Sequence, residues 1–440
     1  MTEPVESWPD LGYRYVTTPE GLAECAAALA HTSVLAADIE GDSFFSYTEK
    51  TCLLQLTGDS GPDWVVDPLL LPDLEALRPL MEDRSVVKIF HGADYDIVSL
   101  KRDHGFAIGP IFDTMIAAQA TGHERFGLQD LVQSYFGDLL DKKYQRHDWS
   151  SRPLRDEHLE YARHDTHYLP RLRELLLAQA VGKDRLPMLE EEFGLLEARE
   201  WTGRPFDADD CLKITGAQKL TEGQQRVLRA LFRLRDGIAS KKNRPGFKVW
   251  GNDVMLLLAR TPPATREVLD ELLGDRNYVA RRYGEEVLAA IAEGLADTSR
   301  IPARRPYEAP TRNLGVPQFT RDDEPLFVHL RSWRNDLATA VALAPAMIVN
   351  NTVLKLIAAL KPQSVEDLRH IDDMRVWQRD EFGAGLVQQS IAYLAAHPTP
   401  GEGAAEGDPD GEPRRRRRRR RRRGGPGPFG DAPPGATGGP

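Results

Sequence analysis

The spacing of apolar residues changes near residue 215, and this change constrains the fold more than any other feature of the 440-residue chain. Before it, short β-branched apolar runs alternate with segments of helical periodicity, whereas only helical periodicity follows it. The runs predict strands at Val34–Glu40, Cys52–Thr57, Trp64–Asp67 and Val86–Phe90. Helices are predicted at Pro19–Leu29, Asp73–Met81, Asp96–Asp103, Thr114–Ala120, Leu128–Phe136 and Glu157–Gln179. A short polar connection after the first strand predicts a hairpin, so we expect a mixed sheet with helices on its faces.

The helical part contains an internal repeat. The segment RLRDGIA at 233–239 aligns with SWRNDLA at 332–338, and Asn252–Ala259 aligns with Asn351–Ala358. Both pairs have the same offset of 99 residues, so the alignment needs no gap. Two copies of one all-α module are therefore predicted.

The two copies differ in the loop that follows their first shared segment. In the first copy, residues 240–248 carry four cations and one aromatic side chain: Lys241, Lys242, Arg244, Phe247 and Lys248. The corresponding residues 339–347 of the second copy are mostly apolar, and we expect them to pack against a neighbour. The cationic loop is suited to hold phosphates and to stack a base on its aromatic ring. A run of charges is also typical of a loop that is merely solvated.

Four carboxylates and one tyrosine lie beside the predicted strands and helices. Asp38 and Glu40 are two residues apart at the end of a strand, so both side chains leave the same face. Asp96 falls in the first turns of a helix, and Tyr161 and Asp165 are four residues apart on one helix face. Carboxylates gathered in one pocket repel one another unless cations bind, and oxygen ligands suit Mg²⁺ or Mn²⁺. The set therefore indicates a two-metal site for attack on a phosphodiester.

These residues and their flanking motifs resemble the ribonuclease D family of 3′-5′ exonucleases, the DEDD group with a tyrosine in its third motif. The second motif is carried by HGADYD at 91–96, and FDT at 112–114 and DWSSRPL at 148–154 also look like family sequence. The resemblance implies a ribonuclease H-like exonuclease domain followed by HRDC modules, which are small helical domains that bind nucleic acid. It also implies two divalent metal ions, Mg²⁺ or Mn²⁺, as cofactors.

The resemblance assigns a role to each residue of the set. Asp38 would bridge both metal ions, and Glu40 and Asp165 would complete the site that holds the attacking water. Asp96 would hold the second ion, which stabilises the leaving 3′-oxygen. Tyr161 would donate or accept a hydrogen bond that orients the water, without acting as a strong base.

Three further polar residues lie beside these motifs. Asp94 is not expected to be a metal ligand, because Asp96 matches the family position. His164 is expected on a different helix face from the catalytic tyrosine. His91 ends an apolar strand, where it either approaches the substrate or has only a structural role.

Composition limits the partners of the chain. The net charge is −10, but residues 401–440 carry ten Arg and six acids, which leaves −14 on the rest. An acidic body does not attract RNA by net charge, so local cations and metal ions must do so. The run Arg414–Arg423 predicts a disordered tail that binds RNA non-specifically or has no selected role. Three widely spaced Cys and an N-terminus without an apolar segment predict a cytoplasmic protein with no membrane span.

The expected organisation is an exonuclease domain at 1–205, an HRDC domain at 215–297, a linker at 298–320, a second, degenerate HRDC-like domain at 321–398 and a disordered arginine-rich tail at 399–440. The leading hypothesis is a monomeric, metal-dependent 3′-5′ exoribonuclease that releases 5′-mononucleotides. Its expected partner is RNA with a free 3′ end, such as a tRNA precursor. The alternatives are an exonuclease acting on DNA and a non-catalytic RNA-binding protein, because the 2′-hydroxyl contacts that distinguish RNA are not visible in sequence.

Overall fold

A computed structural model describes residues 9–203, 205–274, 276–302, 313 and 315–398. The predicted tail at 399–440, with Arg414–Arg423, lies outside the described residues, as do residues 303–312 and 314 of the predicted linker at 298–320. The exonuclease domain and the two helical modules are each described by themselves. The predicted boundaries between them stay predictions.

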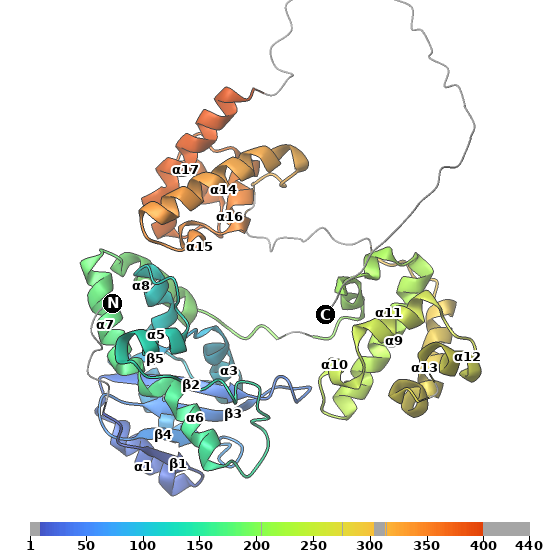
Figure 1. Cartoon of the computed structure of the whole chain (residues 1–440), viewed down its shortest axis with the longest axis horizontal. Coiled ribbons are helices and arrows are strands. Elements are labelled where there is room, and N and C mark those ends of the chain that lie inside the picture. The colour runs from blue at the N-terminus through green and yellow to red at the C-terminus, as the bar shows by residue number, and fades with distance from the viewer. Residues whose placement is uncertain (1–8, 204, 275, 303–312, 314, 399–440) are drawn as a thin grey trace, which may run out of the picture. The chain divides into compact units, whose positions relative to one another are not determined.

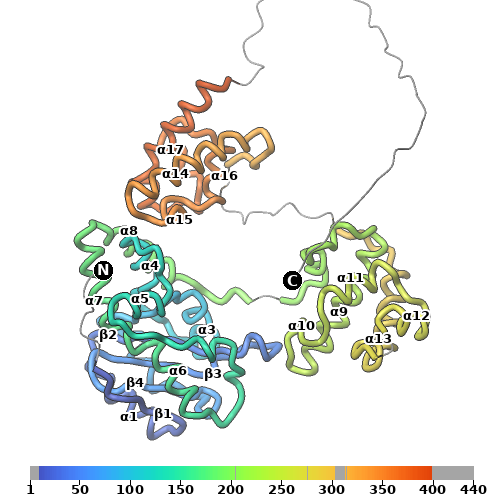
Figure 2. The backbone as a smooth tube through the Cα atoms, viewed as in Figure 1, coloured from blue at the N-terminus to red at the C-terminus, as the bar shows by residue number. Residues whose placement is uncertain are grey.

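The exonuclease domain is built on a six-stranded mixed sheet with the order β1-β4-β3-β2-β5-β6 (Figure 1). Its strands are β1 (Tyr13–Val16), β2 (Val34–Gly41), β3 (Thr51–Thr57), β4 (Asp63–Val66), β5 (Val87–Phe90) and β6 (Ile111–Asp113). The central strand β2 is antiparallel to β3 and parallel to β5, so the predicted hairpin and the mixed sheet are both confirmed. Figure 2 follows the backbone through β2, β3 and β4. Each predicted strand ends within one residue of the observed one, whereas the short edge strands β1 and β6 were not predicted.

Eight α-helices accompany this sheet in the described part of the domain. They are α1 (Pro19–Leu29), α2 (Arg78–Glu82), α3 (Asp94–His104), α4 (Thr114–Ala120), α5 (Leu128–Phe136), α6 (Asp156–His167), α7 (Leu169–Gly182) and α8 (Leu186–Glu197). The single helix predicted over Glu157–Gln179 is wrong, because α6 ends at His167 and a second helix, α7, begins at Leu169, with Tyr168 as the cap between them. Pro170 lacks an N–H and is tolerated only in the first turn of a helix, so it starts α7 rather than continuing α6.

The middle of the sheet forms the core that holds the end of β2 in place. Leu35, Ala36 and Ala37 on β2 are fully buried, and Leu54 and Leu56 on β3 are fully buried beside them. Burial of each leucine side chain stabilises the fold by about 1.5–3 kcal/mol. This core ends where β2 reaches Asp38, so the polar end of the strand is supported by an apolar segment that cannot shift without loss of packing.

The two helical modules share a buried clamp at the offset found in the sequence. In the first, Arg235 donates to the carbonyl oxygen of Trp250 at 3.2 Å and to Asn252 Oδ1 at 2.8 Å. In the second, Arg334 donates to the carbonyl oxygen of Val349 and to Asn351 Oδ1, both at 2.9 Å. Equivalent residues make equivalent contacts, so the two modules have the same internal design.

The helices of the modules follow the repeat. The first contains α9 (Glu222–Lys241), α10 (Gly246–Val249), α11 (Asn252–Arg260), α12 (Arg266–Leu273) and α13 (Tyr278–Ala296). The second contains α14 (Glu324–Ala340), α15 (Pro345–Ile348), α16 (Asn351–Leu360) and α17 (Val376–Ala396), with the 3-10 turn η5 (Glu366–His370) in place of α12. Within the described residues, none of the helices combines the length and the apolar composition that a bilayer crossing requires.

Candidate active site

The end of β2 presents two carboxylates from one face of the sheet. Asp38 and Glu40 alternate with the buried Ile39, as their spacing predicts, and both are partly exposed. Neither carboxylate receives a hydrogen bond or an ion pair from any described residue. A carboxylate left without a partner in a partly buried place is available to a ligand.

Asp96 reaches the same strand from the start of α3. Its Oδ1 accepts the backbone N–H of Ile39 at 3.1 Å, between the two β2 carboxylates, and its side chain is 6% exposed. The turn before α3 contains Gly92 at φ 81°, a left-handed conformation that disfavours any side chain. This turn directs the second motif toward the end of β2.

Asp113 fixes that turn, and the sequence did not single out this role. Its carboxylate accepts backbone N–H groups of Gly92 at 3.0 Å and Ala93 at 2.7 Å. It also caps α4 by accepting the N–H groups of Met115 at 2.8 Å and Ile116 at 3.1 Å. One buried carboxylate therefore joins β6, the turn before α3 and the start of α4. The signal was present as an Asp directly before a helix, which is a typical N-cap.

Tyr161 and Asp165 lie on α6, which packs on β2, β3 and β4 (Figure 1). The ring of Tyr161 packs against Tyr144 at 5.8 Å and against the buried Trp149 at 6.0 Å between centroids. Arg152 holds this segment, because it donates to the carbonyl oxygen of Trp149 at 2.7 Å and to both oxygens of Asp67. The tyrosine ring is thus fixed by neighbours, while its hydroxyl has no hydrogen-bond partner among the described residues.

The four acidic side chains affect one another electrostatically. Burial raises the pKa of Asp38 and Glu40 well above the ordinary value, and Asp96 and Asp165 raise it further. Burial likewise raises the pKa of Asp96 to about 7, and burial together with Asp96 raises the pKa of Asp165 to about 7. Burial and these same acids raise the pKa of the Tyr161 hydroxyl. The four acids therefore lie within electrostatic reach of one another, and their joint negative charge disfavours the site without a cation.

The donor set fits divalent cations that prefer oxygen. Within the part of the chain that the structure describes, no three His, Cys, Asp or Glu side chains are already arranged as a metal-binding group. A cation would therefore have to draw these carboxylates together. Gln55 supports this fit, because it lies opposite Asp38 in the β2–β3 register and is fully buried. Neither amide atom of Gln55 has a hydrogen-bond partner among the described residues, which is typical of a site that holds an ion or its water when filled.

The residues beside the motifs are placed as follows. Asp94 is exposed and pairs with Arg199 at 2.6 Å, and that it is no metal ligand stays a prediction. The Nδ1 atom of His91 lies 2.9 Å from Thr114 Oγ1, and burial lowers the histidine pKa to about 4, which favours its structural role. The prediction for His164 is wrong, because it lines a pocket of about 260 Å³ together with Tyr161 and Asp165. It lies three residues after Tyr161, and side chains at that spacing are neighbours on a helix surface.

Comparisons with known proteins agree with this arrangement. A family model described as 3′-5′ exonuclease matches residues 13–180, and an HRDC domain model matches residues 224–291 and 323–389. Ribonuclease D of Desulfotalea psychrophila is 28% identical over 281 residues, which is 64% of this chain and 75% of that protein. This chain belongs to the ribonuclease D-like family of 3′-5′ exonucleases.

Other members of the ribonuclease D-like family extend the comparison. Protein RRP6-like 2 of Arabidopsis thaliana is 30% identical over 315 residues, 67% of this chain and 35% of that protein. The chain spans between 32% and 48% of the length of the curated relatives that match first. The fold of Escherichia coli RNase D matches with a TM-score of 0.63 at 22% identity and covers 88% of this chain and 100% of that one.

The cationic segment of the first HRDC module runs from Lys241, the last residue of α9, through the connecting turn to Phe247 and Lys248 in α10. All five predicted side chains are exposed, and 56% of Phe247 is accessible to solvent. Lys242 Nζ also donates to the Tyr283 hydroxyl at 2.5 Å. In the second module Leu343 is buried, whereas Ala342, Pro345 and Ala346 are exposed. A role of either loop in binding stays a prediction.

Proposed function

We propose that this chain is a metal-dependent 3′-5′ exoribonuclease that releases 5′-mononucleotides. The observation that carries the proposal is the group of carboxylates at the end of β2, because Asp38, Glu40 and Asp165 have no partner among the described residues. A non-catalytic RNA-binding protein has no need of this costly arrangement. Membership of the ribonuclease D-like family supports the same reading.

Asp38, Glu40, Asp96 and Asp165 would hold two divalent cations, Mg²⁺ or Mn²⁺. When bound, the cations supply Lewis acidity at the attacking water and at the scissile phosphate. Tyr161 would orient the water through its unpartnered hydroxyl, and its raised pKa keeps that group protonated at neutral pH. The rings of Tyr144 and Trp149 hold the tyrosine in place, so little reorganisation is needed when the substrate binds.

We infer that the substrate is RNA with a free 3′ end, with tRNA precursors as the proposed natural case. Lys241, Lys242, Arg244 and Lys248 would contact phosphates and Phe247 would stack on a base. Their exposure on one short segment, from the end of α9 into α10, supports this use. Such a loop gives the enzyme a local attraction for RNA that its acidic body lacks.

The test is to incubate the full chain with matched labelled RNA and DNA in the presence of Mg²⁺, Mn²⁺ or EDTA. We expect stepwise loss of single nucleotides from RNA with either metal ion and none in EDTA. A matched triple variant carries Lys241→Gln, Lys242→Gln and Arg244→Gln. It should slow the trimming of a tRNA precursor with extra 3′ nucleotides more than it slows the trimming of a short single-stranded RNA. Faster degradation of DNA than of RNA would identify a DNA exonuclease, and no degradation of either would contradict an enzymatic function.

A further inference from the structure

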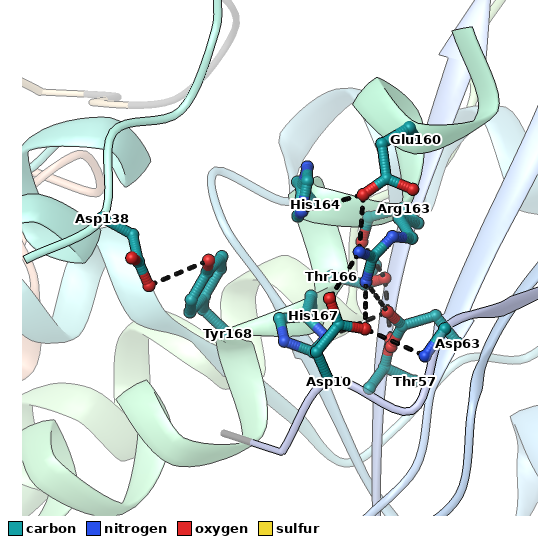
Figure 3. A network of polar contacts seen from close by, with 11 residues as sticks. Asp10, Thr57, Asp63, Asp138, Glu160, Arg163, His164, Thr166, His167 and Tyr168 are labelled. Carbon is teal, nitrogen blue, oxygen red and sulfur yellow. Dashed lines mark hydrogen bonds and ion pairs between the residues drawn. The ribbon is translucent and has the colours of Figure 1, made fainter. Parts of the chain in front are cut away.

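A buried polar network lies on the side of α6 that faces away from the candidate active site. Asp63, the first residue of β4, is 3% exposed, and its carboxylate accepts three hydrogen bonds from other elements. They come from Thr57 Oγ1 at 2.7 Å, Arg163 Nη1 at 3.0 Å and His167 Nδ1 at 2.9 Å (Figure 3). We call Asp63, Thr57, Arg163, Thr166 and His167 the α6 anchor.

Two more contacts tie the same helix to its surroundings. Thr57 Oγ1 also lies 2.9 Å from the hydroxyl of Thr166 on α6. Arg163 reaches Asp10 through two hydrogen bonds of 3.1 and 2.8 Å, and it donates to Glu160 at 2.6 Å (Figure 3). The last two turns of α6 are thus held by directional bonds to β3, to β4 and to the segment before β1.

The anchor and the catalytic residues lie on opposite sides of one helix. At 3.6 residues per turn, the mean direction of Arg163, Thr166 and His167 is roughly 170° from that of Tyr161 and Asp165. A rotation of α6 that moves the anchor must therefore move the tyrosine and the aspartate by a similar amount. Apolar packing alone is not directional and would allow such a rotation more easily than hydrogen bonds do.

The anchor is attached close to the other half of the site. Thr57 pairs with Ala36 on β2, and Asp38 lies only two residues further along that strand, about 7 Å away. The strand that bears Asp38 and Glu40 and the helix that bears Asp165 therefore share one point of support. The carboxylates repel one another before a cation binds, and this repulsion pushes α6 away from β2. A set of hydrogen bonds on the far side of the helix opposes that push.

We propose that Asp63, with Arg163 and His167, is a positioning residue that sets the rotation of α6 and thereby the placement of Tyr161 and Asp165 for hydrolysis. The proposal rests on the catalytic role proposed above for those two residues. Asp63 touches neither substrate nor the reacting atoms, so it acts on the rate only through the helix. Misplacement of a reacting group by about 1 Å costs on the order of a hundredfold in rate.

The decisive experiment is a double-mutant cycle on the full chain with a short single-stranded RNA. Asp63→Asn should lower kcat about tenfold or more with KM changed less than about twofold, because the loss lies in placement rather than in binding. In a Tyr161→Phe background the same change should lower kcat by a clearly smaller factor, because only the placement of Asp165 is then left to lose. Equal factors in both backgrounds, or an unchanged kcat, would overturn the positioning role.

A control separates positioning from loss of stability. Lys88 is a fully buried lysine whose Nζ donates to the carbonyl oxygens of Asp83, Val86 and Gly109, none of them on α6. Lys88→Met should lower the melting temperature while kcat stays near the wild-type value. Both kcat values are measured at a temperature well below the melting transitions of the two proteins. If its kcat falls as far as that of Asp63→Asn at an equal loss of melting temperature, the anchor is merely structural.

Two further variants keep the outcome interpretable. Thr57→Val removes the hydrogen bonds to Asp63 and Thr166 but keeps a β-branched side chain, so it serves the same cycle if Asp63→Asn does not fold. Full kcat in Tyr161→Phe alone would remove the proposed catalytic role and the positioning role with it. A slow Tyr161→Phe together with a fast Asp63→Asn and a fast Thr57→Val would remove only the positioning role.

Discussion

The carboxylates on the two sides of helix α6 differ in whether they have hydrogen-bond partners. On one side Asp165 has no hydrogen bond or ion pair with any described residue, and burial with Asp96 raises its pKa to about 7. On the other side Asp63 is 3% exposed, whereas Asp165 is partly exposed, and Asp63 accepts three hydrogen bonds at 2.7 to 3.0 Å. The same residue type is left free where a ligand is needed and is fully bonded where the fold is held. Activity and stability should therefore depend on different acids of one helix and its supports.

The largest expected effect is on activity. Asp38→Asn and Asp165→Asn should each lower exonuclease kcat at least about 10³-fold, since each removes the charge of a proposed metal ligand. Both variants should melt at the same or a higher temperature than the wild type without metal ions, because a source of repulsion is gone. Activity assays with calorimetry would check both. A variant that loses activity only by unfolding would remove the contrast between the two sides.

The second effect concerns metal ions. Mg²⁺ or Mn²⁺ at a hundred times the dissociation constant should stabilise the wild type by about 2.7 kcal/mol, because the cation binds only the folded state. Asp38→Asn should show a much smaller rise in melting temperature at the same metal concentration. KCl at matched ionic strength serves as the control for screening. Equal rises in both proteins would place the bound cation elsewhere.

The third effect is on stability and concerns the α6 anchor. Asp63→Ala should lower the free energy of unfolding by about 3 kcal/mol, because it leaves Arg163 and His167 buried without their common acceptor. Urea denaturation would measure the loss. A change below about 1 kcal/mol would show that the network contributes little to stability. Asp63 would then resemble Asp38 and Asp165, whose replacement is not expected to lower stability.

The smallest effect depends on pH. Hydrogen bonds from Arg163 lower the pKa of Asp10 to about 2, so its ionised form stabilises the fold above the unfolded pKa, and this contribution is lost as pH falls toward 2. Asp10 is 57% exposed, and solvent screening reduces the expected contribution to about 1 kcal/mol. Asp10→Asn should therefore lower stability at pH 7 and make little difference near pH 2. A constant difference across that range would contradict an ionic role.

Much of the side of α6 that bears the candidate catalytic residues could be predicted from the sequence, because the spacing patterns that indicate it are local. The spacing of Asp38 and Glu40 gives one face of a strand, and the spacing of Tyr161 and Asp165 gives one face of a helix. The strands of the central hairpin were equally clear, since each contains a short apolar run, at 34–37 and at 52–54.

The α6 anchor on the opposite side could not be predicted, because the residues that bond to one another there are distant in the chain. Asp63 meets Arg163 and His167 across 100 and 104 residues, and Asp10 meets Arg163 across 153. These contacts depend on the parallel pairing of β1 with β4, and β1 itself gave no clear signal. The unpartnered amide of Gln55 was hidden for the same reason, since only the strand register places it opposite Asp38.

The central claim is that the carboxylates of β2, α3 and α6 make this chain an enzyme that shortens RNA from its 3′ end. The most direct measurement is a time course on 5′-labelled RNA with a free 3′ hydroxyl, with Mg²⁺, using wild type and Asp165→Asn. We predict a ladder that shortens one nucleotide at a time, release of 5′-mononucleotides, and no ladder with the variant or with a blocked 3′ end. Internal cleavage, attack from the 5′ end, or an undiminished ladder with Asp165→Asn would contradict the claim.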